Sequence, residues 1–95
     1  MRLEWDEAKA AKNLRQHGVS FTEGGTVFGD PLATTKADPD HSEDEERSLT
    51  TGLSSDNRPV IVWHADREDA GELVIRIIGV RRPTPREWRT YESGE

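Results

Sequence analysis

The sequence lacks cysteine and has few of the residues that build a large core. Of its 95 residues, 32% are hydrophobic and 6% are aromatic. Without cysteine there is no disulfide framework and no thiolate chemistry, which is typical of a reducing compartment. A chain of this length buries roughly 60–65% of the surface that its unfolded form exposes, so we expect a small core and a single domain over residues 1–95.

Long apolar runs are also missing. No segment approaches the roughly 18 apolar residues that a membrane helix requires, and the first twenty residues hold no apolar stretch typical of a secretory signal. We therefore expect a cytoplasmic protein that does not meet a membrane. Three tryptophans and the strand-forming run Val60–Trp63 argue against a disordered chain.

Positive charge is in deficit, and one segment accounts for the whole deficit. The formal net charge is −6, and residues 37–46 contain six acids and no base, so the rest of the chain is neutral. An EF-hand reading of this segment fails because Glu43 stands at the required glycine position and Leu49 at that of the bidentate acid. We expect a solvated acidic loop that binds no metal and either points away from any anionic ligand or docks a basic partner segment.

A cationic segment lies near the other end of the chain. Residues 76–91 contain five arginines and one acid, and ten of the thirteen basic residues of the chain are arginine. The planar guanidinium group binds phosphate oxygens in a bidentate manner. Because the chain as a whole is acidic, we expect phosphate recognition to be confined to this segment.

The pattern of apolar and turn residues predicts an α+β fold with a small, mostly antiparallel sheet. The predicted order is β-α-α-β-β-β-β-α, with two helices near the N-terminus and one near the C-terminus. Polar connections are expected at residues 54–57 and 66–71. The predicted strands cover residues 3–5, 32–37, 47–53, 59–64 and 73–80, and the first helix covers residues 7–16.

Helix-start signals are clear at three places. Asp6 is an expected N-cap, and Gly18 is expected to end the helix that follows. Ser20 and Glu23 have the spacing of a capping box, as do Thr84 and Glu87, where Pro85 also fits the first helical position. These signals predict a short second helix that ends near residue 28 and a C-terminal helix.

Four strings carry a family resemblance. WDEAKAAKNLRQHGVSF, VFGDPL, DPDHSEDEER and IRIIGVRRPTPREWRTYE occur in this order between Trp5 and Tyr91. In order and spacing they resemble the BrnT-like toxins of type II toxin–antitoxin modules. The chain departs from the usual family pattern at Gln16, at Gly79-Val80 and at Pro83.

The resemblance implies a RelE-like ribonuclease fold and RNA cleavage that arrests translation without a metal or other cofactor. It also implies neutralisation by a small BrnA-like antitoxin that binds operator DNA, so the chain would meet DNA only through that partner. The departures from the family pattern leave an alternative open, a toxin-derived module that binds the partner but has lost catalysis.

Metal-free RNA cleavage requires cations around the reacting phosphate. Arg76 and Arg81 are the predicted cations, because guanidinium groups keep their charge at any working pH. Strict strand alternation would place the two side chains on opposite faces of the sheet. A bulge or strand end at Gly79 would bring them to the same face. The alternative is an ordinary solvated strand and its exit.

Three histidines are candidates for proton transfer, and Glu87 and Tyr91 are two further candidates for catalytic roles. His41 lies in the acidic loop, where neighbouring carboxylates would favour its charged form, or it is a solvated loop residue. His17 is favoured by the resemblance, although a histidine at a helix C-terminus also interacts favourably with the helix dipole. Glu87 is a candidate general base, but its capping role is the better explanation of its position. Tyr91 could contact a phosphate or a base, or pack against the sheet. His64, at the end of an apolar strand, is interpreted as structural.

Four further residues are predicted to bind RNA. Lys9 and Asn13 share a helix face with His17, and that face is either a polar site or a solvated surface. Arg82 and Arg86 belong to the cationic segment.

Overall fold

The computed structural model describes residues 1–39 and 46–94. His41 and most of the predicted acidic loop lie outside these ranges. Within them the elements follow the predicted order, and the α+β class is confirmed. The elements are β1 (Arg2–Glu4), α1 (Glu7–His17), α2 (Phe21–Gly25), the 3₁₀ helix η1 (Thr26–Gly29), β2 (Thr34–Ala37), β3 (Ser48–Leu53), β4 (Pro59–Asp69), β5 (Glu72–Arg81) and α3 (Pro85–Glu92).

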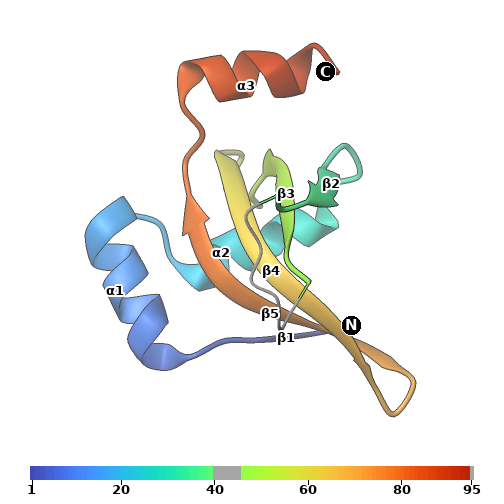
Figure 1. Ribbon diagram of the computed structural model, residues 1–95. Helices are drawn as coiled ribbons and strands as arrows, with labels where there is room; N and C mark the ends of the chain where they lie inside the picture. The colour runs from blue at the N-terminus through green and yellow to red at the C-terminus, as the bar shows by residue number, and fades with distance from the viewer. Residues whose placement is uncertain (40–45, 95) are drawn as a thin grey trace.

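The described strands form one sheet in the order β1-β5-β4-β3-β2. β1 runs parallel to β5, and the other neighbours are antiparallel. In Figure 1, α1 flanks β5, α2 crosses one face of the sheet, and α3 lies across the far end of the strands. The apolar core lies between that face and the N-terminal helices. Its buried members are Val19, Phe21, Val27, Val60, Val62, Ile77 and Val80.

Helix α1 begins and ends at the predicted caps. The Asp6 side chain accepts a hydrogen bond from the backbone N–H of Lys9, and Gly18 ends the helix with a φ of 70°. Asn13 is buried and points at the edge of β5. Its amide donates to the carbonyl oxygens of Val80 (2.8 Å) and Val19 (3.1 Å), and its side-chain oxygen accepts from the Val80 N–H (3.1 Å). The side chain thus satisfies backbone groups that a neighbouring strand would otherwise pair.

Helix α2 has half of the expected capping box. The Ser20 hydroxyl accepts from the Glu23 N–H at 3.0 Å, but the Glu23 carboxylate contacts Ser54 and Arg58 instead of the helix start. The glycine pair that follows is required by close packing. A Cβ atom on Gly24 would lie 2.5 Å from a methyl carbon of Val80.

The prediction of a polar connection at residues 66–71 is wrong. β4 continues through this segment to Asp69, and a two-residue turn, Ala70-Gly71, joins it to β5 with positive φ at both positions. Polar side chains are tolerated here because they pair across strands. Arg67 binds the Glu4 carboxylate, and Arg2 contacts Asp69 at 3.2 Å.

A chain of polar contacts runs across three strands on the helix-covered face, with Thr50 and His64 buried at its centre and Asp66 and Thr35 exposed at its ends. His64 Nδ1 lies 2.6 Å from the Asp66 carboxylate, and His64 Nε2 lies 2.7 Å from the Thr50 hydroxyl. The Thr50 hydroxyl lies 2.6 Å from that of Thr35. His64 also packs edge-on against Phe28. These contacts satisfy the buried imidazole inside the fold, in line with its structural interpretation.

Candidate functional site

A β-bulge in β5 determines which arginines share a face. Trp63 pairs with Gly79 and the next residue of β4, His64, pairs with Ile77, so Ile78 is the extra residue. The bulge predicted at Gly79 is therefore present one residue earlier. It reverses the alternation of side chains beyond it.

As a result, Arg76 and Arg81 lie on the same face of the sheet, the face that α2 does not cover. Arg76 faces Ala65 across the ladder and Arg81 faces Ile61. The two positions are four residues apart along β4, which corresponds to roughly 13 Å. Arg76 is exposed and lies close enough to Glu4 to help lower the pKa of that carboxyl, after the larger effect of Arg67.

The Arg81 guanidinium is held from several sides. It donates to both carboxylate oxygens of Glu87 at 2.8 Å and to the carbonyl oxygen of Arg82 at 3.1 Å. Its central carbon lies 5.2 Å from the centre of the Trp63 ring. An arginine placed in this way presents a fixed, planar set of donors next to an aromatic surface.

Glu87 has two structural roles. It completes the capping box of α3, because its carboxylate accepts from the Thr84 N–H at 2.8 Å and its own N–H donates to the Thr84 hydroxyl at 3.1 Å. The hydrogen bond from Arg81, followed by that from Thr84, lowers the pKa of Glu87 to about 2. While Arg81 binds it, Glu87 is therefore a weak base.

Helix α3 contacts the rest of the protein mainly through its two ends. None of its eight residues is buried. At its start, Glu87 binds Arg81, and near its end the Tyr91 hydroxyl donates to the Leu32 carbonyl oxygen at 2.7 Å. Tyr91 also stacks on Trp88, with ring centres 4.7 Å apart. Burial raises the pKa of Tyr91, and the nearby Asp30 charge adds to this effect.

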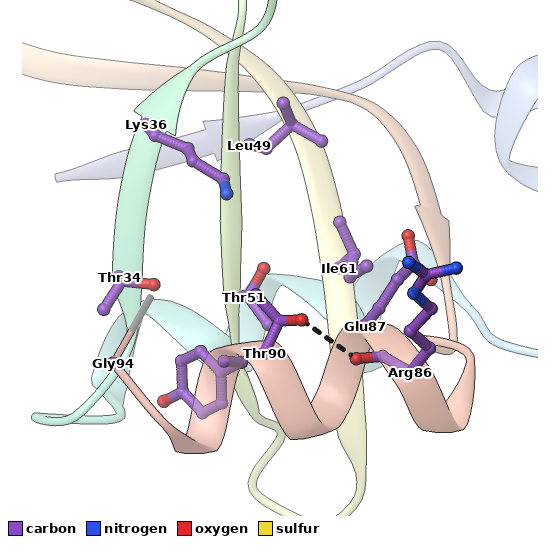
Figure 2. Close-up of a pocket in the computed structure, with 10 residues that line it drawn as sticks. Thr34, Lys36, Leu49, Thr51, Ile61, Arg86, Glu87, Thr90 and Gly94 are labelled. Carbon is purple, nitrogen blue, oxygen red and sulfur yellow. Dashed lines mark hydrogen bonds between the residues drawn. The ribbon is translucent and has the colours of Figure 1, made fainter.

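A groove of about 440 Å³ separates α3 from the sheet face that carries Arg81. We call it the α3 groove. Its floor comes from β2, β3 and β4, and its wall from α3, as Figure 2 shows. The lining residues are Thr34, Lys36, Leu49, Thr51, Ile61, Arg86, Glu87, Thr90, Tyr91 and Gly94.

A second hollow, of about 400 Å³, lies beside the first and also borders Tyr91. We call it the acidic hollow, because its charged lining residues are Asp30 and Glu92. Backbone N–H groups of Leu53 and Leu32 lower the pKa of Asp30. The two hollows therefore carry charges of opposite sign.

The structure brings some of the predicted site residues together and separates others. Glu87, Tyr91 and Arg86 line the α3 groove, and Arg81 binds Glu87 at its β5 end. Arg76 shares the face but lies farther along β5, and Arg82 is half-buried on the connection to α3.

The predicted residues on α1 lie elsewhere. Lys9 and His17 are exposed, and neither lines the α3 groove. Asn13 is buried, and its amide is engaged with backbone groups of Val19 and Val80 rather than with solvent. The spacing of the three residues on one helix face therefore does not produce one continuous polar surface.

Sequence reasoning missed Lys36. It lies on β2 and lines the α3 groove at the end opposite β5. Its only signal in the sequence is that it stands two residues after Thr34, and so on the same face of a predicted strand. The location of that face could not be read from the sequence.

Within residues 1–39 and 46–94, no three His, Asp or Glu side chains are grouped closely enough to hold a metal ion. In the same ranges, no helix is long and apolar enough to cross a membrane.

Comparison with known proteins identifies the family. Residues 5–87 match the family of BrnT ribonuclease toxins of type II toxin–antitoxin systems. The chain belongs to the BrnT toxin family. Membership implies an antitoxin partner and an RNA substrate.

A solved structure supports the fold assignment. The crystal structure of the Brucella abortus ribonuclease toxin BrnT is 20% identical in sequence and superposes with a TM-score of 0.60, covering 88% of this chain and 97% of the other. Among curated protein sequences, none matches this BrnT family member.

Proposed function

We propose that this chain is an endoribonuclease toxin that cleaves RNA without a metal ion, inhibits translation and is neutralised by a BrnA-like antitoxin. It would act in the cytoplasm as a single RelE-like domain over residues 1–95 and would meet operator DNA only through the antitoxin. Family membership supports this proposal. The observation that carries it is the placement of Arg76 and Arg81 on one exposed sheet face beside a groove.

In the proposed reaction, Arg81 releases the Glu87 carboxylate and binds a substrate phosphate in its place. A substrate phosphate binds the guanidinium that now holds Glu87, and the phosphate charge that grows in the transition state strengthens this contact. Loss of the Arg81 hydrogen bonds raises the pKa of Glu87 from its low value, so the carboxylate becomes a better base.

The freed Glu87 then accepts the proton of the ribose 2′-hydroxyl. The 2′-oxygen forms a bond to phosphorus, the bond from phosphorus to the 5′-oxygen breaks, and the leaving oxygen takes a proton. Tyr91 lies one helical turn from Glu87 and is the proposed proton donor, once its hydroxyl leaves the Leu32 carbonyl oxygen. His17 remains the second candidate donor, from α1.

Incubation of the purified chain with total RNA in excess EDTA tests this proposal. We expect cleavage that is lost in the Arg76→Ala, Arg81→Ala double variant. Glu87→Gln is expected to bind RNA at least as well as the wild type and to cleave it more slowly. Thermal melting of each variant checks that it is folded. Intact RNA with the wild-type chain, or equal cleavage by the double variant, would contradict the proposal.

One observation favours a second candidate function, a binding module without catalysis. Arg81 is already paired with Glu87 on both carboxylate oxygens, and His17 does not line the groove. Induced expression in a bacterial host separates the two candidates. A ribonuclease toxin arrests growth, and the arrest is relieved by Arg81→Ala, whereas an inactive module leaves growth unchanged at the same expression level.

A further inference from the structure

The α3 groove extends beyond the arginines predicted for cleavage. It begins at Glu87, next to Arg81, passes Ile61 on β4 and Leu49 on β3, and ends at Lys36 on β2. From β5 to β2 it crosses three strand spacings, or roughly 14 Å. A ligand that reacted only at Arg81 would leave most of this length empty.

The charges along the groove are arranged for an extended anion. Lys36 and Arg86 both line it, and the one acid in its lining, Glu87, is neutralised by Arg81. Figure 2 shows the Lys36 side chain leaving β2 toward β3, and the Arg86 side chain rising from α3 beside Ile61. The neighbouring acidic hollow has the opposite sign, which confines an anionic chain to the α3 groove.

The uncharged lining suits the faces and edges of unpaired bases. Leu49 and Ile61 provide an apolar floor, and the hydroxyls of Thr34 and Thr51 lie beside them. Bases in a duplex are stacked on one another and cannot present their faces to such a floor. Single-stranded RNA offers both its phosphates and its base faces.

We propose that single-stranded RNA lies along the α3 groove from Arg81 to Lys36, and that Lys36 binds a phosphate away from the cleaved one. This inference rests on the proposed function, because it extends the same site. It adds a residue and a direction: from the phosphate at Arg81, the bound strand continues across β4, β3 and β2 to Lys36.

The test measures binding and cleavage separately. The probe for binding is a fluorescent ten-nucleotide RNA of mixed sequence with every ribose 2′-O-methylated, which removes the attacking hydroxyl. We expect Lys36→Ala to bind it more weakly, with a slope of log affinity against log salt that is less steep by about 0.7, as for one lost phosphate contact on a single strand. The matched control, Lys12→Ala on α1, is expected to keep the wild-type slope.

The outcomes distinguish this inference from the proposed function. If total RNA is cleaved while Lys36→Ala and Lys12→Ala keep the same salt slope, the groove inference fails and the ribonuclease proposal stands. If Lys36→Ala alone shows the smaller slope but the wild-type chain cleaves nothing, the groove binds RNA and the ribonuclease proposal fails. A dependence on Lys36 seen with a polyglutamate peptide and not with RNA overturns the inference and identifies a protein-docking groove. Matching melting temperatures for both variants confirm that the comparison is between folded proteins.

Discussion

Asn13 shows how one side chain replaces a strand at the edge of a sheet. β1 covers only the first part of β5, from Val74 to Arg76. Farther along, the Asn13 amide binds both the N–H and the carbonyl of Val80, and a third contact reaches Val19. Because these groups are buried, removing the amide leaves them without partners.

We therefore expect Asn13→Ala to lower the free energy of unfolding by about 2–3 kcal/mol. Urea denaturation followed by circular dichroism measures this change. Lys12→Ala, at an exposed position of the same helix, is the control and should stay within about 0.5 kcal/mol of the wild type. A similarly small effect of Asn13→Ala would show that the Asn13 hydrogen bonds contribute little to stability.

Glu87 should make the stability of the protein depend on pH in acid. Arg81 and Thr84 lower its pKa in the folded state to about 2 from an ordinary 4.5. A carboxyl whose pKa is depressed by folding stabilises the protein above its unfolded pKa, and this contribution disappears as the pH falls through the folded value. The window is therefore between about pH 4.5 and pH 2.

Glu87→Gln tests this dependence, because the amide oxygen can still accept the Thr84 N–H but carries no charge for Arg81. We expect the wild type to be more stable than Glu87→Gln at pH 6, and the gap to narrow as the pH is lowered toward 2. Other carboxyls titrate in both proteins, so only the difference is informative. A gap that stays constant down to pH 2 would show that Arg81 does not hold the carboxylate in solution.

At the scale of elements, α3 and the β4–β5 hairpin differ in the contacts that fix them to the rest of the protein. β4 and β5 pair over most of their length, and they carry seven of the buried apolar residues: Val60, Ile61, Val62, Val74, Ile75, Ile77 and Val80. Helix α3 has no buried residue and depends on its capping box, on the Arg81 ion pair and on the Tyr91 hydroxyl. We expect α3 to open without unfolding of the sheet.

Amide hydrogen exchange tests this expectation. Thr84→Ala removes one half of the capping box, at a cost of about 1 kcal/mol, which corresponds to roughly fivefold faster exchange in α3. Exchange of the β4 and β5 amides should change little, and these strands provide the internal control. If α3 and the two strands accelerated together, α3 would belong to the same cooperative unit as the sheet.

At the scale of the whole molecule, the proposed function requires a negatively charged protein to bind RNA, which is also negatively charged. The net charge of −6 opposes the approach of RNA, so binding depends on local cations. Four of them lie on or beside the proposed path, namely Arg76, Arg81, Arg86 and Lys36.

From these four cations we expect the log of the RNA affinity to fall against the log of the salt concentration with a slope of about −3 for a single strand. Titration of the 2′-O-methylated RNA at several salt concentrations measures the slope. The Arg76→Ala, Arg81→Ala double variant should reduce it to about half. A wild-type slope near zero would mean that phosphate contacts on this face do not drive binding.

Local rules were enough to predict much of the fold from the sequence. Helix starts at Asp6 and Thr84 and the helix stop at Gly18 follow from short-range hydrogen bonding and glycine's left-handed backbone, which a few neighbouring residues decide. The strand order along the chain and the α+β class follow from the periodicity of apolar residues. The extension of β4 through a polar segment could not be predicted, because pairing with β5 and the Arg67–Glu4 contact outweigh local preference.

Some features of the candidate site could likewise be predicted from the sequence, and others required the tertiary structure. The sequence by itself determined the family, the cationic character of residues 76–91 and the residue types proposed to bind phosphate, because these depend on composition and motif spacing. Only the tertiary structure decided that a bulge turns Arg81 to the face of Arg76, that Asn13 is buried and that Lys36 lines the α3 groove. Those facts depend on how distant strands pair, and strand register is settled by packing across the whole sheet and not by any local segment.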